Sequence, residues 1–229
     1  MGQSTSTHST SEERLQSEKD FHNQSFSEGL RAHIDPYYEI FIGIRKSFKR
    51  RILSFIKNKD ILECGCGPST FAPEFAPKCH SLMGIDISEE AVEQSREKAM
   101  EAGLTNVHFT VMNAEELDLP DESVSLLFGS GIIHHLDIRA FYREATRVLE
   151  KEGRIMFMEP LGHNPIINLY RSLTPKMRTP DEHPLTKRDV RQLRRYFKRL
   201  DLKYYYFFTL LAIPFRKMPF FKPLVSFLD

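Results

Sequence analysis

Short apolar runs alternate with helix-like patterns through the middle of the chain, an order of elements that builds a parallel sheet with crossover helices. The runs that we predict as strands are residues 59–64, 81–87, 107–112, 124–128 and 154–159. Ser88 is placed to cap the helix after the second run, and Gly103 to end it. A second helix, beginning near Ile138, is predicted to end at Gly153. The pattern therefore predicts an α/β fold, with a doubly wound, mostly parallel sheet in three α/β/α layers.

The N-terminal part of the chain differs from this core. Residues 1–20 are dominated by Ser, Thr, Gln and charged side chains, so we predict a disordered polar arm. Residues 21–58 are predicted as a helical segment, in which apolar side chains recur every three or four positions over residues 37–57. We expect this helix to pack against the sheet or a partner subunit, with a lid over a substrate site as the alternative. Residues 59–229 are the predicted main domain, with an insert and cap at about 160–200.

The C-terminal part combines a basic helix with an apolar tail. Lysine and arginine crowd the helix predicted over residues 187–199, where a solvated surface is the first interpretation and an anionic ligand the alternative. Residues 202–228 are strongly apolar and aromatic, and residues 204–208 have the pattern of a sixth strand. Such a tail could touch a membrane surface peripherally or join two copies of the chain in a homodimer.

Composition narrows the range of functions. The chain has 229 residues and a formal net charge of +1, so one large domain is expected and bulk charge does not favour a nucleic-acid partner. No apolar run reaches the about 18 to 20 residues of a membrane-spanning helix, and three cysteines do not suggest a disulfide framework. We therefore expect a cytoplasmic location. Residues 1–6 fit the N-myristoylation pattern, but a disordered Ser/Thr-rich arm is the favoured interpretation.

A glycine loop follows the first predicted strand. Gly65 and Gly67 let the backbone pass close to a ligand, and Asp86 ends the next strand 21 residues after Gly65. A carboxylate at this spacing is typical of a group that binds ribose hydroxyls, so the two features together indicate a nucleoside cofactor. Thr70 stands where a dinucleotide fingerprint has its third glycine, which weakens the interpretation as an NAD site.

This loop and the segments after it resemble the class I, Rossmann-like S-adenosylmethionine (SAM)-dependent methyltransferases, in particular a bacterial small-molecule subset. The matching segments are residues 62–69, 84–88, 113–115, 129–136 and 147–154, so the resemblance covers roughly residues 60–160. It implies SAM as the cofactor. The residues that it implies as cofactor-binding are Glu63, Gly65, Cys66, Gly67, Asp86, Ile87, Asn113, Ala114, Glu115 and Gly131. Glu63 and the loop glycines would hold the methionine part, Asp86 the ribose, and residues 113–115 the adenine end. Ser69 departs from the family, which often has a glycine there.

The acceptor is expected beyond the fourth and fifth strands. Methyl transfer from a sulfonium mainly requires alignment, and a base is needed only where the nucleophile must lose a proton. The candidate catalytic residues are His134, His135, Glu159 and His163, and residues 179–185 bring Glu182 and His183 as further candidates for acceptor contact. Backbone hydrogen bonding by these side chains is the structural alternative.

The sequence gives no expectation of a metal site. Cys79 is the only cysteine besides Cys64 and Cys66, so a cysteine-based zinc site would lack its usual four ligands. The predicted function is transfer of a methyl group from SAM to a small-molecule or lipid-like acceptor. The alternatives are a non-catalytic SAM-binding module and an NAD(P)-dependent oxidoreductase.

Overall fold

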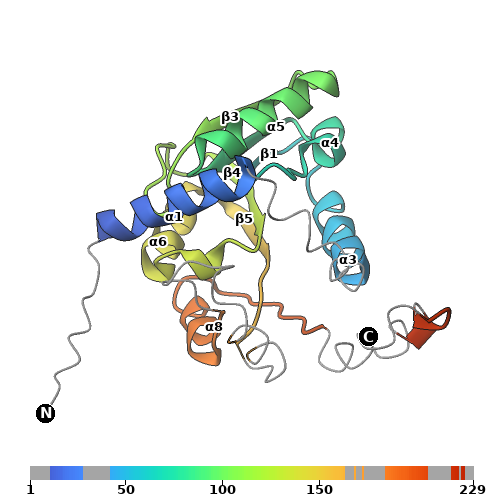
Figure 1. Cartoon of the computed structure of the whole chain (residues 1–229). Coiled ribbons are helices and arrows are strands. Elements are labelled where there is room, and N and C mark those ends of the chain that lie inside the picture. Colours follow the sequence, from blue (N-terminus) through green and yellow to red (C-terminus); the bar gives the residue numbers. More distant parts are fainter. Residues whose placement is uncertain are drawn as a thin grey trace, which may run out of the picture.

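The computed structural model describes residues 11–27, 42–162 and 184–205, together with residues 168, 172, 218–221, 223 and 224. The elements in chain order are α1 (Ser11–Ser27), α3 (Ile42–Leu53), β1 (Asp60–Cys64), α4 (Ala72–Phe75), η2 (Ala76–Lys78), β2 (Ser81–Asp86), α5 (Glu89–Glu101), β3 (Val107–Val111), β4 (Val124–Ser130), η3 (Ile133–His135), α6 (Ile138–Val148), β5 (Leu149–Met158) and α8 (Lys187–Leu193). Figure 1 shows their arrangement. No helix in these parts of the chain is both long enough and apolar enough to span a bilayer.

Five parallel strands form a single sheet in the order β3-β2-β1-β4-β5. The strand order reverses between β1 and its neighbour β4, and a crevice at such a point is where ligands bind in doubly wound sheets. The register pairs Cys64 with Ile85 of β2 and with Gly129 of β4. The carboxyl ends of the three central strands therefore lie at one level, and the predicted Rossmann-like α/β fold is confirmed.

Alternate residues of the central strands feed two apolar cores on opposite faces of the sheet. On one face, Leu62 and Leu127 pack with Phe141 of α6 and Leu193 of α8. The side chains that form the other core include Phe48, Ile52, Phe75, Val92, Leu126 and Phe128, from α3, α4, α5 and β4. Because side chains alternate across a strand, neighbours such as Leu126 and Leu127 serve different cores. The sheet is thus the middle of three layers, and the expectation that residues 37–57 supply a sheet-packing helix is met by α3 within its described range.

Two local predictions are wrong. Residues 11–20, which we expected in a disordered arm, form the first part of α1. This helix has little apolar surface, and polar contacts with distant segments hold it, which a local pattern does not reveal. Gly153 does not end a helix: α6 stops at Val148, and Gly153 lies inside β5, close to the backbone of Glu150.

The described residues include only part of the C-terminal region, so they test only some of the predictions made for it. The basic helix is shorter than expected, because α8 ends at Leu193 rather than near residue 199. Tyr204 and Tyr205, the described residues of the predicted sixth strand, are not in a strand, and residues 206–208 lie outside the described residues. The division at residues 58 and 59 stays a prediction.

We expect Ser88→Ala to lower the free energy of unfolding by about 1 kcal/mol, within a range of about 0.5–2 kcal/mol. Ser88 is fully buried at the N-cap of α5, where its hydroxyl accepts a hydrogen bond from Ala91 N (3.1 Å) and donates one to Asn23 Oδ1 of α1 (2.6 Å). Urea unfolding followed by circular dichroism measures the change. Thr105→Ala, at an exposed position, is the control and should shift stability by less than about 0.5 kcal/mol. Equal effects of the two substitutions would contradict the capping role.

Candidate functional site

The glycine loop after β1 passes close to the turn after β4. Gly65 and Gly67 have φ angles of 65° and 51°, in the left-handed region that favours glycine. A Cβ atom at Gly65 would lie 2.7 Å from the side chain of Ile132, so this position also excludes a side chain sterically. The loop therefore places backbone atoms without side chains at the carboxyl end of the central strand, as the sequence predicted.

Asp86 joins this loop to the end of β2. Its Oδ2 accepts a hydrogen bond from Gly67 N, and its Oδ1 accepts one from Ser88 N, each at 3.0 Å. The loop is anchored further by Cys66 N, which donates to Ile85 O (3.0 Å), and by the Ser95 hydroxyl, which donates to Gly67 O (2.7 Å). Each carboxylate oxygen of Asp86 retains acceptor capacity for a ligand hydroxyl, since an ionised carboxylate offers about four lone-pair sites.

Glu63 lies below the loop rather than in the cavity. Its carboxylate is 2% exposed and accepts hydrogen bonds from the Thr70 hydroxyl (2.6 Å) and from Phe71 N (2.9 Å). Burial raises the pKa of this carboxyl from its ordinary 4.5 to about 8, against the lowering effect of the two hydrogen bonds. Glu63 thus shapes the loop from behind, and Thr70 is a structural partner of Glu63 in addition to interrupting the glycine pattern.

A cavity opens above these strand ends, with about 700 Å³ of empty space that includes its solvent-open part. Its walls come from the ends of β1, β2, β3 and β4 and from α1. The predicted cofactor residues that line it are Gly65, Asp86, Ile87, Asn113, Ala114 and Gly131. Glu63, Cys66, Gly67 and Glu115 are not in its lining. The buried Cys66 packs in the core instead, and burial raises the pKa of the Cys64 and Cys66 thiols, which disfavours the thiolate that a metal would require.

The two histidines after β4 have different surroundings. His135 lines the cavity, whereas His134 is buried behind it, with Nδ1 2.8 Å from Glu159 Oε2. The other oxygen of Glu159 accepts hydrogen bonds from Ile132 N (2.9 Å) and Ile133 N (3.1 Å). Glu159 at the end of β5 therefore fixes the turn that carries both histidines. His163, Glu182 and His183 lie outside the described residues.

Helix α1 supplies a wall of the cavity that the sequence interpretation missed. The side chains that it contributes are Arg14, Leu15, Glu18, His22 and Phe26. Arg14 Nη2 donates hydrogen bonds to both carboxylate oxygens of the buried Glu115 (2.6 and 2.7 Å), and Arg14 Nη1 donates one to His135 O (2.9 Å). Glu115 also accepts from Asp137 N (2.8 Å), so it acts as an anchor for α1 rather than as a cavity residue. The spacing of Leu15, His22 and Phe26 on one helical face was the available signal, but the surrounding polar residues obscured it.

This strand order, the glycine loop and the acid at the end of β2 together form the Rossmann-like arrangement that the sequence predicted around the cavity. Residues 61–153 match the family model described as a methyltransferase domain. The sequence of residues 61–153 is therefore similar to that of methyltransferase domains, in agreement with the resemblance.

Individual relatives agree with this class. The uncharacterized methyltransferase YcgJ of Bacillus subtilis is 30% identical over 122 residues, covering 52% of this chain and 48% of that protein. The ubiquinone/menaquinone biosynthesis C-methyltransferase UbiE of Rickettsia massiliae is 33% identical over 128 residues, covering 52% of each. The crystal structure of YcgJ superposes with a TM-score of 0.56 at 25% identity, over 65% of both chains. The chain thus spans about half the length of the curated relatives that it matches.

We expect the stability of the wild-type protein to fall with rising pH relative to that of Glu63→Gln. The folded-state pKa of Glu63 is raised to about 8, so between about pH 4.5 and 8 the folded state holds a proton that the unfolded state releases. The stabilisation is complete below this window and is lost as pH rises through it, by at most about 1.4 kcal/mol per pH unit. Urea unfolding of both proteins without ligand at pH 5, 6.5 and 8 measures the difference. The exposed Glu116→Gln serves as control, and parallel pH profiles for wild type and Glu63→Gln would show that the Glu63 carboxyl ionises normally.

Proposed function

We propose that the protein is a SAM-dependent methyltransferase that transfers a methyl group to a small-molecule or lipid-like acceptor by direct displacement. When bound, SAM supplies a methyl group on a positively charged sulfur. The bond from the acceptor atom to the methyl carbon forms as the carbon–sulfur bond breaks, and S-adenosylhomocysteine leaves with the electron pair of that bond. The protein's task is then to align the acceptor and to exclude water. Both requirements fit a cavity between strand ends and a covering helix.

The observation that carries this proposal is the position of Asp86. Its carboxylate lies in the cavity wall at the end of β2, the neighbour of β1, and accepts a hydrogen bond from Gly67 N at 3.0 Å. The strand order reverses on the other side of β1, and ligands bind at such a point in doubly wound sheets. A carboxylate with free lone pairs beside a glycine loop suits a ribose with two hydroxyls. Apolar side chains at Ile87 and Met112, with the amide of Asn113 nearby, provide a slot of mixed polarity suited to adenine.

The residues behind the cavity wall would contribute by setting the backbone. Glu63 orients the loop that carries Gly65 and Gly67 toward the methionine part, through its bonds to Thr70 and Phe71. Glu115 would act in the same way at the adenine end, since its own N–H bonds Asn113 Oδ1 (3.0 Å) and its carboxylate fixes Arg14.

On the acceptor side, His135 is the described candidate with access to the cavity. His134 and Glu159 would position the turn beneath it, and His163 remains a predicted catalytic residue. A histidine at this place can take a proton from an acceptor whose nucleophile must lose one, and it is dispensable for a nucleophile that carries none.

Several further points support the proposal. The printed name of UbiE, a ubiquinone/menaquinone biosynthesis C-methyltransferase, supports a small or lipid-like acceptor. A phosphoethanolamine N-methyltransferase of Haemonchus contortus, solved with phosphoethanolamine and S-adenosylhomocysteine, shares the fold with a TM-score of 0.55 at 24% identity. All three cysteines are free thiols, which suits the reducing cytoplasm that we propose as the location. Peripheral membrane contact and a homodimer stay predictions.

We expect Asp86→Ala to weaken SAM binding by about 10- to 100-fold, the range for loss of a hydrogen bond to a charged group. Isothermal titration calorimetry with SAM and S-adenosylhomocysteine measures the affinity. Asp118→Ala removes an exposed carboxylate of the β3–β4 connection and should leave the affinity unchanged. Equal affinities for wild type and Asp86→Ala would remove Asp86 from the site.

The competing functions are separated by titrating the wild type with NAD and NADP in the same way. Binding of NAD without SAM would establish the oxidoreductase alternative and overturn the proposal. Transfer of label from methyl-labelled SAM to a component of a cell extract distinguishes an enzyme from a non-catalytic SAM-binding module.

A further inference from the structure

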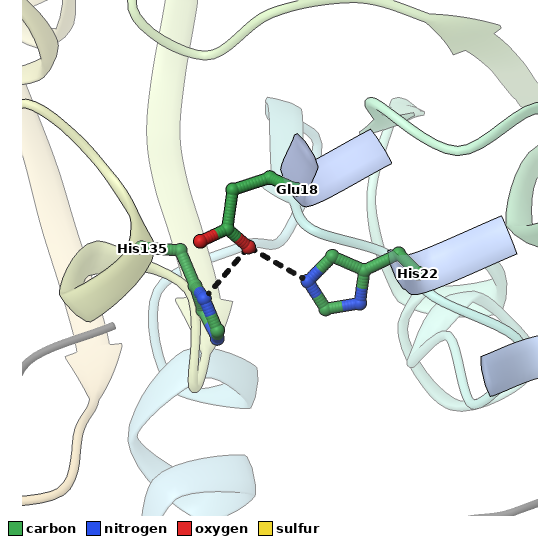
Figure 2. Close-up of side chains that lie close together, drawn as sticks. All are labelled: Glu18, His22 and His135. Atoms are coloured by element: carbon green, nitrogen blue, oxygen red, sulfur yellow. Dashed lines mark ion pairs between the residues drawn. The ribbon is translucent and has the colours of Figure 1, made fainter. Parts of the chain in front are cut away.

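Three side chains converge on one point at the rim of the cavity. Glu18 and His22 project from α1, and His135 approaches them from η3, as Figure 2 shows. Glu18 Oε2 lies 3.1 Å from His135 Nδ1 and 3.5 Å from His22 Nε2. The three side chains are only 5%, 10% and 13% exposed for Glu18, His135 and His22 respectively. A carboxylate and two imidazoles thus face one another with little access for water.

The spacing of these atoms is that of ligands around a metal ion. Zinc binds imidazole nitrogen and carboxylate oxygen at about 2.0–2.2 Å, so two donors that subtend about 90–110° at the ion lie about 2.8–3.6 Å apart. The two nitrogen–oxygen separations fall inside this interval. One ligand atom from each residue lies within 4.8 Å of the other two, so a single ion can lie between them.

Hydrogen bonding within the described part of the chain does not account for the cluster. His135 Nδ1, the nitrogen that faces Glu18, is buried and has no hydrogen-bond partner among the described residues. The same holds for His22 Nδ1, although the His22 nitrogen that faces Glu18 is Nε2. In particular, the 3.1 Å approach of His135 Nδ1 to Glu18 does not have hydrogen-bond geometry. Buried polar atoms of this kind generally require an additional partner, such as a water molecule or an ion.

The identity of the donors restricts the ion. Neutral imidazole suits zinc, iron, copper and nickel, and a single carboxylate is a common companion, whereas magnesium and calcium favour sites made of oxygen alone. Three protein ligands also leave at least one coordination position open, as in catalytic zinc sites. All three residues line the cavity that contains Asp86 and Gly131, so the ion would lie at the wall of this cavity.

We infer that Glu18, His22 and His135 bind a divalent transition-metal ion of the zinc class, and that this ion fastens α1 over the cavity. Two ligands lie four residues apart on one face of α1, and the third lies on the turn that Glu159 fixes. Metal binding would therefore cross-link the N-terminal helix to the carboxyl end of β4. The inference does not depend on the proposed function, because the ligands are a property of the apo chain.

The test is calorimetric titration of ZnCl₂ into the untagged full-length chain after dialysis against a chelator. The wild type should bind one zinc ion with micromolar or tighter affinity, and its melting temperature should rise by a few °C at saturating zinc. Replacement of zinc by Co²⁺ should give a visible absorption band, since Co²⁺ has the d–d transitions that Zn²⁺ lacks. Glu18→Gln and His135→Ala should each weaken zinc binding by at least about 10- to 100-fold, the loss seen when only a supporting residue is removed.

His108→Ala is the matched control, because it removes an exposed histidine of β3 that is remote from the cluster, and it should bind zinc like the wild type. Circular dichroism of every variant establishes that it is folded. No zinc binding by the wild type, or equal loss in His108→Ala and His135→Ala, overturns the inference. SAM titration of the same samples keeps the two proposals apart: zinc binding without SAM binding counts against the methyltransferase proposal alone, and SAM binding without zinc binding counts against the metal site alone.

Discussion

The site depends on the pair of hydrogen bonds that the Asp86 carboxylate accepts from the backbone of Gly67 and Ser88. The first bond ties the glycine loop of β1 to β2, and the second holds the residue that caps α5. Both are charge-assisted, which makes them stronger than bonds between neutral groups. Because β1 and β2 pair in register up to Cys64 and Ile85, the loop can reach the carboxylate without distortion of the sheet. The register of β1 and β2 and the carboxylate of Asp86 together set the position of the glycine loop that lines the cavity.

Three buried glutamates near the cavity also accept hydrogen bonds from the backbone, as Asp86 does. Glu63, Glu115 and Glu159 each accept a hydrogen bond from a backbone N–H of a neighbouring loop. A buried charge is costly unless it is hydrogen-bonded, and the loops supply donors that no regular element satisfies. Glu63 meets only neutral donors, and burial raises its pKa. Glu115 also forms an ion pair with the guanidinium of Arg14.

Much of the fold was predictable, because the strands and the helix α5 are local patterns. Apolar runs, the Ser88 cap and the glycine after α5 specify elements without reference to the rest of the chain, and the first four strands agree with the predicted ranges to within two residues. β5 begins at Leu149, five residues before the predicted start, because the segment expected to end a helix is part of this strand. That Asp86, Asn113 and Gly131 line the cavity was also predictable, because each lies at or just after the carboxyl end of a strand. The orientation of Glu63 was not, because the sequence does not reveal that its carboxylate turns to Thr70.

The sequence did not predict that α1 forms a wall of the cavity, and the physical reason lies in how this helix is held. Helix α1 is attached mainly by polar pairs, including Arg14 with Glu115, Lys19 with Glu89, and Asn23 with Ser88. Their partners lie far away in sequence, so no local periodicity marks them. Apolar burial is concentrated instead in the two cores on the faces of the sheet. Displacement of α1 would break ion pairs and hydrogen bonds while leaving both cores intact, and segments with few buried apolar contacts open at the lowest free energy. We therefore expect α1 to be the part of the cavity wall that can be displaced at the lowest free energy. A shared ion that binds residues of α1 and η3 would raise this free energy.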